Sequence, residues 1–173
     1  PTCEDDSKDL DLLNMVKHYI KVTYDKPGNV YVGLVHRLDR PTGGVMVFAK
    51  SSKAAARLTE QIQNGDFEKR YYAVVCGVPE EEQATLVHYV KKNAVNNMVY
   101  VTAPTVVGAK RAELNYKVLE KLSDSALVDV RLYTGRSHQI RVQMSKQNKT
   151  VIFGDFKYGD KTHKSNLALW TYK

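Results

Sequence analysis

The sequence has 173 residues, 43% of them hydrophobic and 26% charged, with a formal net charge of +7. This length suits one globular domain that buries a sufficient core without stabilising metals or disulfides. The two distant cysteines favour a reducing, cytoplasmic setting over a disulfide framework. No apolar run approaches membrane-spanning length, the acidic start is unlike a signal peptide, and the five histidines lack the spacings of a zinc site.

The first third of the chain carries signals for both helices and strands. Residues 10–21 repeat apolar side chains at helical spacing, and residues 51–65 do so between a serine that can cap the start and a glycine that suits the end. Two short buried strands are expected at 31–35 and 45–49. They lie on either side of the motif GLVHRLDRPTGG, residues 33–44.

The rest of the chain is predicted to be rich in strands. Apolar and polar residues alternate over 111–120 and 125–133, which indicates half-buried antiparallel neighbours joined around 123–124. Further strands are expected at 69–77, 85–90, 98–102 and 167–170. Residues 134–147 are predicted to turn from strand into helix, with Thr134 as the cap. Because strands outnumber helices and do not alternate with them, we expect an α+β fold: a single domain with a largely antiparallel mixed β-sheet flanked by helices and loops.

Positive charge gathers in the last third of the chain. Residues 136–164 hold seven lysines and arginines against two aspartates. A basic segment of this kind suits RNA or DNA, because it can contact phosphates and release their counterions. A solvated lysine-rich face explains the composition equally well.

The motif at 33–44 places one carboxylate between two arginines. Asp39 has Arg37 and Arg40 within two positions, and such neighbours usually form surface ion pairs worth under about 1 kcal/mol. Adjacent residues of a strand point to opposite faces, so a carboxylate aimed into a cleft needs a cation from elsewhere. Arg136 can supply a planar pair of hydrogen bonds. Held in this way, Asp39 stays ionised and oriented, as a nucleophile or a base requires.

Two further segments carry residue types with a chemical use. Cations, Arg136 among them, crowd the start of the helix predicted after Thr134, which opposes the helix dipole and suits an anion-binding site; an exposed basic helix start is the alternative. Tyr71 and Tyr72 point to opposite faces of their strand. One of them can enter a cleft and stack on an unstacked base, although most strand tyrosines only pack.

Four segments, in order, resemble the RluA-like pseudouridine synthases. That family carries the patterns HRLD-[RK]-x-[TS]-S-G, K-x-Y-x-A, T-G-R-[TS]-H-Q-I-R and G-D-x-x-Y-G. They occur here as HRLDRPTGG (36–44), KRYYA (69–73), TGRSHQIR (134–141) and GDFKYG (154–159). The chain departs from the family pattern at Gly43, where serine is usual, at Ser137, where threonine is commoner, and at Trp170, where histidine is frequent.

The resemblance implies an enzyme that isomerises uridine to pseudouridine in ribosomal or transfer RNA, without cofactor or metal. It implies that Asp39 is the essential aspartate, that Tyr71 contacts the target base, and that Arg136 pairs with Asp39 in an active-site cleft on the sheet. Arg37 matches a position that can fill the gap left by the flipped nucleotide. The residues leave open whether Asp39 attacks C1′ of the ribose or removes the C2′ proton.

The whole chain, 1–173, is expected to be one catalytic domain, trimmed at both ends, monomeric and without an S4-type RNA-binding domain. Two other hypotheses remain. A non-catalytic RNA-binding module that kept the fold would bind RNA without chemistry. A ribonuclease that uses His36 and His138 as acid and base would cleave it.

Overall fold

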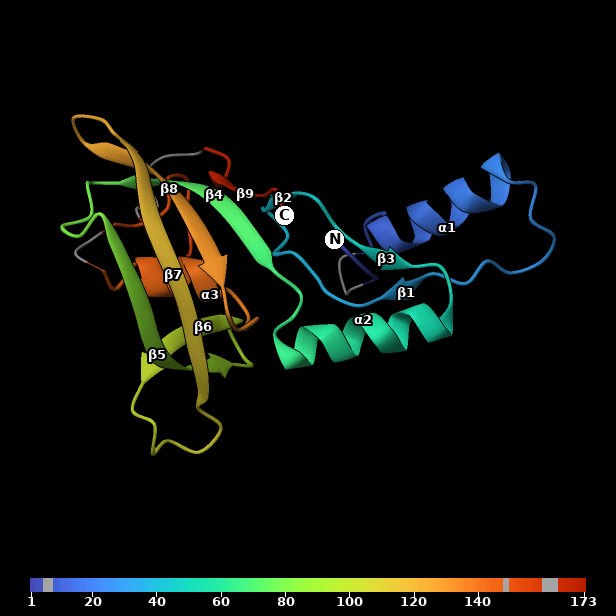
Figure 1. The fold of residues 1–173 in the computed structure, drawn as a ribbon, viewed down its shortest axis with the longest axis horizontal. Coiled ribbons are helices and arrows are strands. Elements are labelled where there is room, and N and C mark those ends of the chain that lie inside the picture. Colours follow the sequence, from blue (N-terminus) through green and yellow to red (C-terminus); the bar gives the residue numbers. More distant parts are fainter. Residues whose placement is uncertain (5–7, 148–149, 160–164) are drawn as a thin grey trace. The chain divides into compact units, whose positions relative to one another are not determined.

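The structure is a computed structural model, and it describes residues 1–4, 8–147, 150–159 and 165–173. The chain divides into two compact units (Figure 1). The first unit comprises Pro1–Arg40 and Val45–Phe67, and the second comprises Pro41–Gly44 and Glu68–Lys173. That residues 1–173 act as one catalytic domain stays a prediction.

The first unit contains two helices and one pair of very short strands. α1 spans Leu12–Thr23, and the carboxylate of Asp11 caps it by accepting a hydrogen bond from the Asn14 N–H at 2.9 Å. The predicted helix is therefore confirmed, although none of its side chains is fully buried. β1 (Gly33–Leu34) pairs antiparallel with β3 (Phe48–Ala49), and both strands are shorter than predicted.

α2 spans Ser52–Asn64 and packs against β1 and β3 (Figure 1). The hydroxyl of Ser51 accepts a hydrogen bond from the Ala54 N–H at 3.2 Å, which satisfies one of the amides left unpaired at the start of a helix. The helix ends at Gly65, whose φ of 82° lies in the left-handed region that favours glycine. Both ends of α2 are as predicted.

The second unit is built on a seven-stranded sheet, with the order β2-β9-β4-β8-β7-β5-β6. Its strands are β2 (Gly43–Gly44), β4 (Lys69–Cys76), β5 (Gln83–Asn93), β6 (Met98–Thr102), β7 (Lys110–Lys121), β8 (Ser125–Leu132) and β9 (Leu169–Thr171). The pair β2–β9 is parallel, and the other neighbours are antiparallel. The predicted α+β class with a largely antiparallel mixed sheet is confirmed.

Alternation along the two central strands puts one face of the sheet into the core. Ala112, Leu114 and Tyr116 of β7 are completely buried, as are Val128 and Val130 of β8. Burial of Leu114, Val128 or Val130 stabilises the fold by roughly 1.5–3 kcal/mol per side chain relative to exposure. The register of β7 and β8 is thereby fixed, because a slip of one residue would turn these side chains toward solvent.

α3 spans Gln139–Met144, and all of its side chains are buried, including the predicted inward-facing Ile140 and Met144. The prediction that Thr134 caps this helix is wrong. His138 occupies the N-cap position with a φ of 50° and offers no side-chain cap bond. The hydroxyl of Thr134 instead accepts the backbone N–H of Glu113, in β7, at 2.8 Å.

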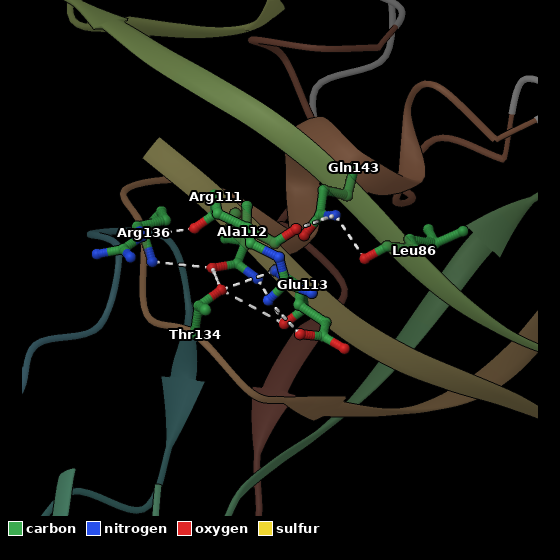
Figure 2. Close-up of polar contacts among 8 residues, drawn as sticks. Leu86, Arg111, Ala112, Glu113, Thr134, Arg136 and Gln143 are labelled. Carbon is green, nitrogen blue, oxygen red and sulfur yellow. Dashed lines mark hydrogen bonds and ion pairs between the residues drawn. The ribbon is translucent and has the colours of Figure 1, made fainter. Parts of the chain in front are cut away.

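Gln143 fixes α3 to two strands of the sheet (Figure 2). Its Nε2 atom donates to the carbonyl oxygens of Leu86, in β5, at 3.0 Å and of Ala112, in β7, at 3.3 Å. The same atom lies 3.1 Å from Nδ1 of His88, whose pKa is lowered first by burial and then by the charge of Lys146. These contacts hold the helix that follows the turn at 134–138.

Glu68 precedes β4 and is surrounded by cations. It forms ion pairs with Lys173 and, at 2.8 Å, with Arg70. The hydrogen bond from Lys173, and next that from Arg70, lower the pKa of Glu68 to about 2 from the ordinary 4.5. A carboxylate with a lowered folded-state pKa stabilises the fold above pH 4.5, and this stabilisation is lost as the pH falls from 4.5 toward 2.

We expect Glu68→Gln to lower the melting temperature at pH 7 by roughly 1–2 °C and to leave it nearly unchanged at pH 2.5. The physical reason is that at pH 2.5 the carboxyl is protonated in the unfolded chain, so most of the stabilisation that the lowered folded-state pKa provides at pH 7 is gone. Thermal melts at several pH values, followed by circular dichroism, measure the difference. An equal loss at both pH values would contradict the expectation.

Candidate functional site

The motif that carries Asp39 runs from the first unit into the second, with Arg40 as the last residue of one and Pro41 as the first of the other. Asp39 is half-buried in a segment without regular structure, and Arg37 is exposed. Arg40 forms an ion pair with Asp9. Arg40 therefore has an acidic partner other than its sequence neighbour.

The two glycines at the end of this motif lie against β9. β2 and β9 align Gly43 with Trp170 and Gly44 with Thr171. A Cβ atom on Gly43 would lie 2.3 Å from Cζ3 of the Trp170 indole, and one on Gly44 would lie 2.0 Å from the Thr171 carbonyl oxygen. Gly44 also has a φ of 118°. The indole thus fills the space that a serine at position 43 needs. The departures from the family pattern at Gly43 and Trp170 are therefore sterically coupled.

We expect Gly43→Ser alone to lower the free energy of unfolding by roughly 1–3 kcal/mol, because the new side chain must displace the indole of Trp170. Adding Trp170→His, which brings in a smaller ring, is expected to recover most of that loss. Urea denaturation of wild type, both single variants and the double variant gives the coupling free energy. Strictly additive losses would show that the two positions do not interact.

The two tyrosines of β4 lie on opposite faces, as predicted. Tyr71 is 7% exposed and shares its face with the buried side chains of Ala73 and Val75. Tyr72 is 40% exposed and stacks on Tyr172, with ring centroids 4.1 Å apart. The tyrosine that matches the K-x-Y-x-A pattern, Tyr71, is therefore the one on the buried face.

A network of hydrogen bonds fixes the turn that carries Arg136 (Figure 2). Oε1 of Gln139 accepts the Arg136 backbone N–H at 2.9 Å and the Thr134 hydroxyl at 2.8 Å, while its Nε2 donates to the Glu113 carbonyl at 3.0 Å. Nε of Arg136 donates to the carbonyl oxygen of Arg111 at 2.9 Å. Hydrogen bonds to carbonyl oxygens of β7 therefore fix both the turn and the Nε atom of the Arg136 side chain. The sequence pattern does not predict the role of Gln139, because its partner in β7 is not adjacent in sequence.

Arg141 is not a phosphate contact, and the prediction for the basic segment is wrong at this position. Its side chain is 5% exposed, and Nε and Nη2 donate to the two carboxylate oxygens of Asp155 at 2.8 and 2.7 Å. A buried arginine of this kind requires such a bidentate partner, which here joins the TGRSHQIR segment to GDFKYG. Three other lysines of the basic segment lie outside the described residues: Lys149, Lys161 and Lys164.

The two histidines of the ribonuclease hypothesis are held by the surrounding structure. Nε2 of His36, in the first unit, accepts the Val47 N–H at 3.0 Å. Nδ1 of His138, in the second unit, lies 2.7 Å from the hydroxyl oxygen of Tyr158, which also accepts the Val99 N–H at 2.9 Å. These bonds give both rings a structural role.

Of the predicted site residues, Tyr71 and Arg136 belong to the second unit, on β4 and on the turn after the neighbouring strand β8. Asp39 and Arg37 belong to the first unit, and the pairing of Asp39 with Arg136 stays a prediction, as does the cleft on the sheet. Among the described residues, no three histidine, cysteine, aspartate or glutamate side chains are grouped so that they could hold a metal ion. No helix in that part of the chain has the length and apolarity of a membrane span.

Comparison with known proteins shows the family. Residues 6–146 match the family described as RNA pseudouridylate synthase, and the chain belongs to that family. An uncharacterised RNA pseudouridine synthase of Chlorobaculum parvum is 35% identical over an alignment of 155 residues that covers 87% of this chain and 47% of the relative. The ribosomal large subunit pseudouridine synthase C of Vibrio cholerae is 34% identical over 136 residues, 79% of this chain and 42% of the relative.

The chain therefore spans less than half the length of these relatives. A solved structure of human RNA pseudouridylate synthase domain containing 4 aligns with a TM-score of 0.79, over 93% of this chain and 72% of that one, at 23% identity. That likeness shows the fold.

Proposed function

We propose that the chain is the catalytic domain of an RNA pseudouridine synthase that isomerises specific uridines of ribosomal or transfer RNA. The observation that carries the proposal is the presence, in a chain of this family, of the HRLD motif around Asp39 together with an arginine, Arg136, whose backbone and side chain are both fixed by hydrogen bonds. The name of the Vibrio cholerae relative, which refers to the large ribosomal subunit, supports an RNA substrate.

In the proposed mechanism, the target uridine first leaves its stack, which costs a few kcal/mol, and Arg37 fills the gap. Tyr71 contacts the extruded base. Asp39, kept ionised by Arg136, attacks C1′ or removes the C2′ proton, and the bond between N1 and C1′ breaks. The uracil then turns and joins C1′ through C5, which releases Asp39 from C1′ in the first route and returns the proton from Asp39 to C2′ in the second, while N1 gains a proton and C5 loses one.

The loss of the C5 proton gives a direct test. RNA isolated from cells that lack the gene, labelled with tritium at uracil C5, is expected to release tritium to water when the protein is added. Binding without release would support the non-catalytic module, and shortened RNA would support the ribonuclease. Primer extension after carbodiimide treatment, in cells with and without the gene, identifies the modified uridine.

The proposal includes RNA as the partner, with no membrane, a monomer, no cofactor or metal, and a cytoplasmic location. Cys3 and Cys76 are both free thiols in the structure, which suits a reducing compartment. Size-exclusion chromatography with light scattering tests the monomer, and a dimer of defined mass would overturn that part.

A further inference from the structure

Lys69 is the first residue of β4, and strand alternation puts it on the same face as Tyr71. Its Nζ atom lies against the turn before Arg136, since a Cβ atom built on Gly135 would be 3.1 Å from it. The side chain is half-buried. The amine of Lys69 therefore lies at the turn that carries Arg136, on the face of β4 that also carries Tyr71.

Lys69 lies close enough to a second cation, Arg136, for the charge of the arginine to act on it. Burial, and next the charge of Arg136, lower the pKa of Lys69 from its ordinary 10.5. Within the described part of the chain, Lys69 forms no ion pair, and the neighbouring Glu68 is engaged by Arg70 and Lys173. Because a partly desolvated ammonium beside a like charge costs free energy, an anion placed there would relieve it.

We propose that Lys69 binds a phosphate group of the substrate RNA at the turn before Arg136. The inference rests on the proposed function and adds a contact that the motif match does not assign. Residues two apart in a strand are about 6.6 Å apart, a span that one nucleotide can bridge between its base and a phosphate. Tyr71 and Lys69 then hold the base and the phosphate of the same region of RNA.

The two cations then have different tasks. Arg136 keeps Asp39 ionised, so its removal affects the chemical step. Lys69 contacts the RNA backbone, so its removal weakens RNA binding. RNA binding by the variant then releases one counterion fewer than binding by wild type. Their substitutions are therefore distinguishable by kinetics and by the dependence of binding on salt.

The test compares Lys69→Gln with wild type. KM for labelled RNA is expected to rise about tenfold while kcat stays within about twofold, and the slope of log Kd against log salt for a uridine-containing RNA is expected to fall by about one. Lys69→Arg, which keeps the charge, is expected to keep the slope. Lys121→Gln is the control, because it removes an exposed lysine that already pairs with Glu82 at 2.8 Å.

An unchanged salt slope in Lys69→Gln, or a loss of kcat at constant KM, would overturn the inference. The melting temperature provides a second measurement. Removing a desolvated ammonium is expected to raise it by about 2 °C, whereas a structural lysine would lower it. If wild type releases no tritium, the proposed function fails, yet the salt slopes still test the phosphate contact on binding alone.

Discussion

Replacing Asp39 by asparagine is expected to reduce tritium release from labelled RNA by at least about 1,000-fold. Asparagine has almost the same size as aspartate, but its amide can neither attack C1′ nor accept the C2′ proton. RNA binding is expected to stay within about twofold of wild type, because the substitution removes no cation that contacts phosphate. Filter binding and tritium release on the same preparations separate the two quantities.

The matched control is Asp9→Asn, which makes the same chemical change in the same unit. Asp9 is exposed and pairs with Arg40, so its substitution is expected to cost little, as is usual for a surface ion pair. A fully active Asp39→Asn protein would remove Asp39 from the mechanism. An equal loss in both variants would show that the assay reports on the local fold around Arg40.

Arg136→Ala is expected to lower kcat about 100-fold and to leave the salt slope of RNA binding nearly unchanged. The backbone N–H bond to Gln139 survives the substitution, so the turn keeps its shape and only the guanidinium is lost. Arg136→Lys is expected to recover part of the activity, because an ammonium supplies the charge but not the planar pair of donors. Single-turnover kinetics with saturating enzyme measure the chemical step.

Arg111→Ala is the matched control for this variant. It removes an exposed guanidinium that pairs with Glu113, while the Arg111 carbonyl that accepts from Arg136 stays in place. We expect near-normal kcat. A fall of about one in the salt slope of Arg136→Ala would identify Arg136 as a phosphate contact and would exchange the tasks proposed for Arg136 and Lys69.

Elements whose signals are local could be predicted from the sequence. α2 begins at a serine that caps its own first turn and ends at a glycine with a left-handed backbone, and both rules involve only neighbouring residues. β7 and β8 were predictable because alternation describes each strand by itself. The same holds for the opposite faces of Tyr71 and Tyr72.

Features that depend on distant partners could not be predicted in this way. Thr134 has the residue type and position of a helix cap. In the structure its hydroxyl instead accepts a hydrogen bond from the backbone N–H of Glu113, in β7. Arg141 looks like part of a basic surface until Asp155 pairs with it in the interior. The role proposed for Lys69 is hidden for the same reason, because its neighbour Gly135 follows the end of β8 and is distant in sequence.

The register of β9 has a consequence for how the protein acquires its site. Thr171 is aligned with Gly44 on one side and with Tyr71 on the other, so β9 joins the end of the motif that carries Asp39 to the strand that carries Tyr71. These partners are separated by most of the chain, and closing so long a loop is entropically costly and slow. A nascent chain that has not yet reached Leu169 can already form the β7–β8 hairpin, but not this alignment. We therefore expect the proposed site to be completed only after β9 has paired with β2 and β4.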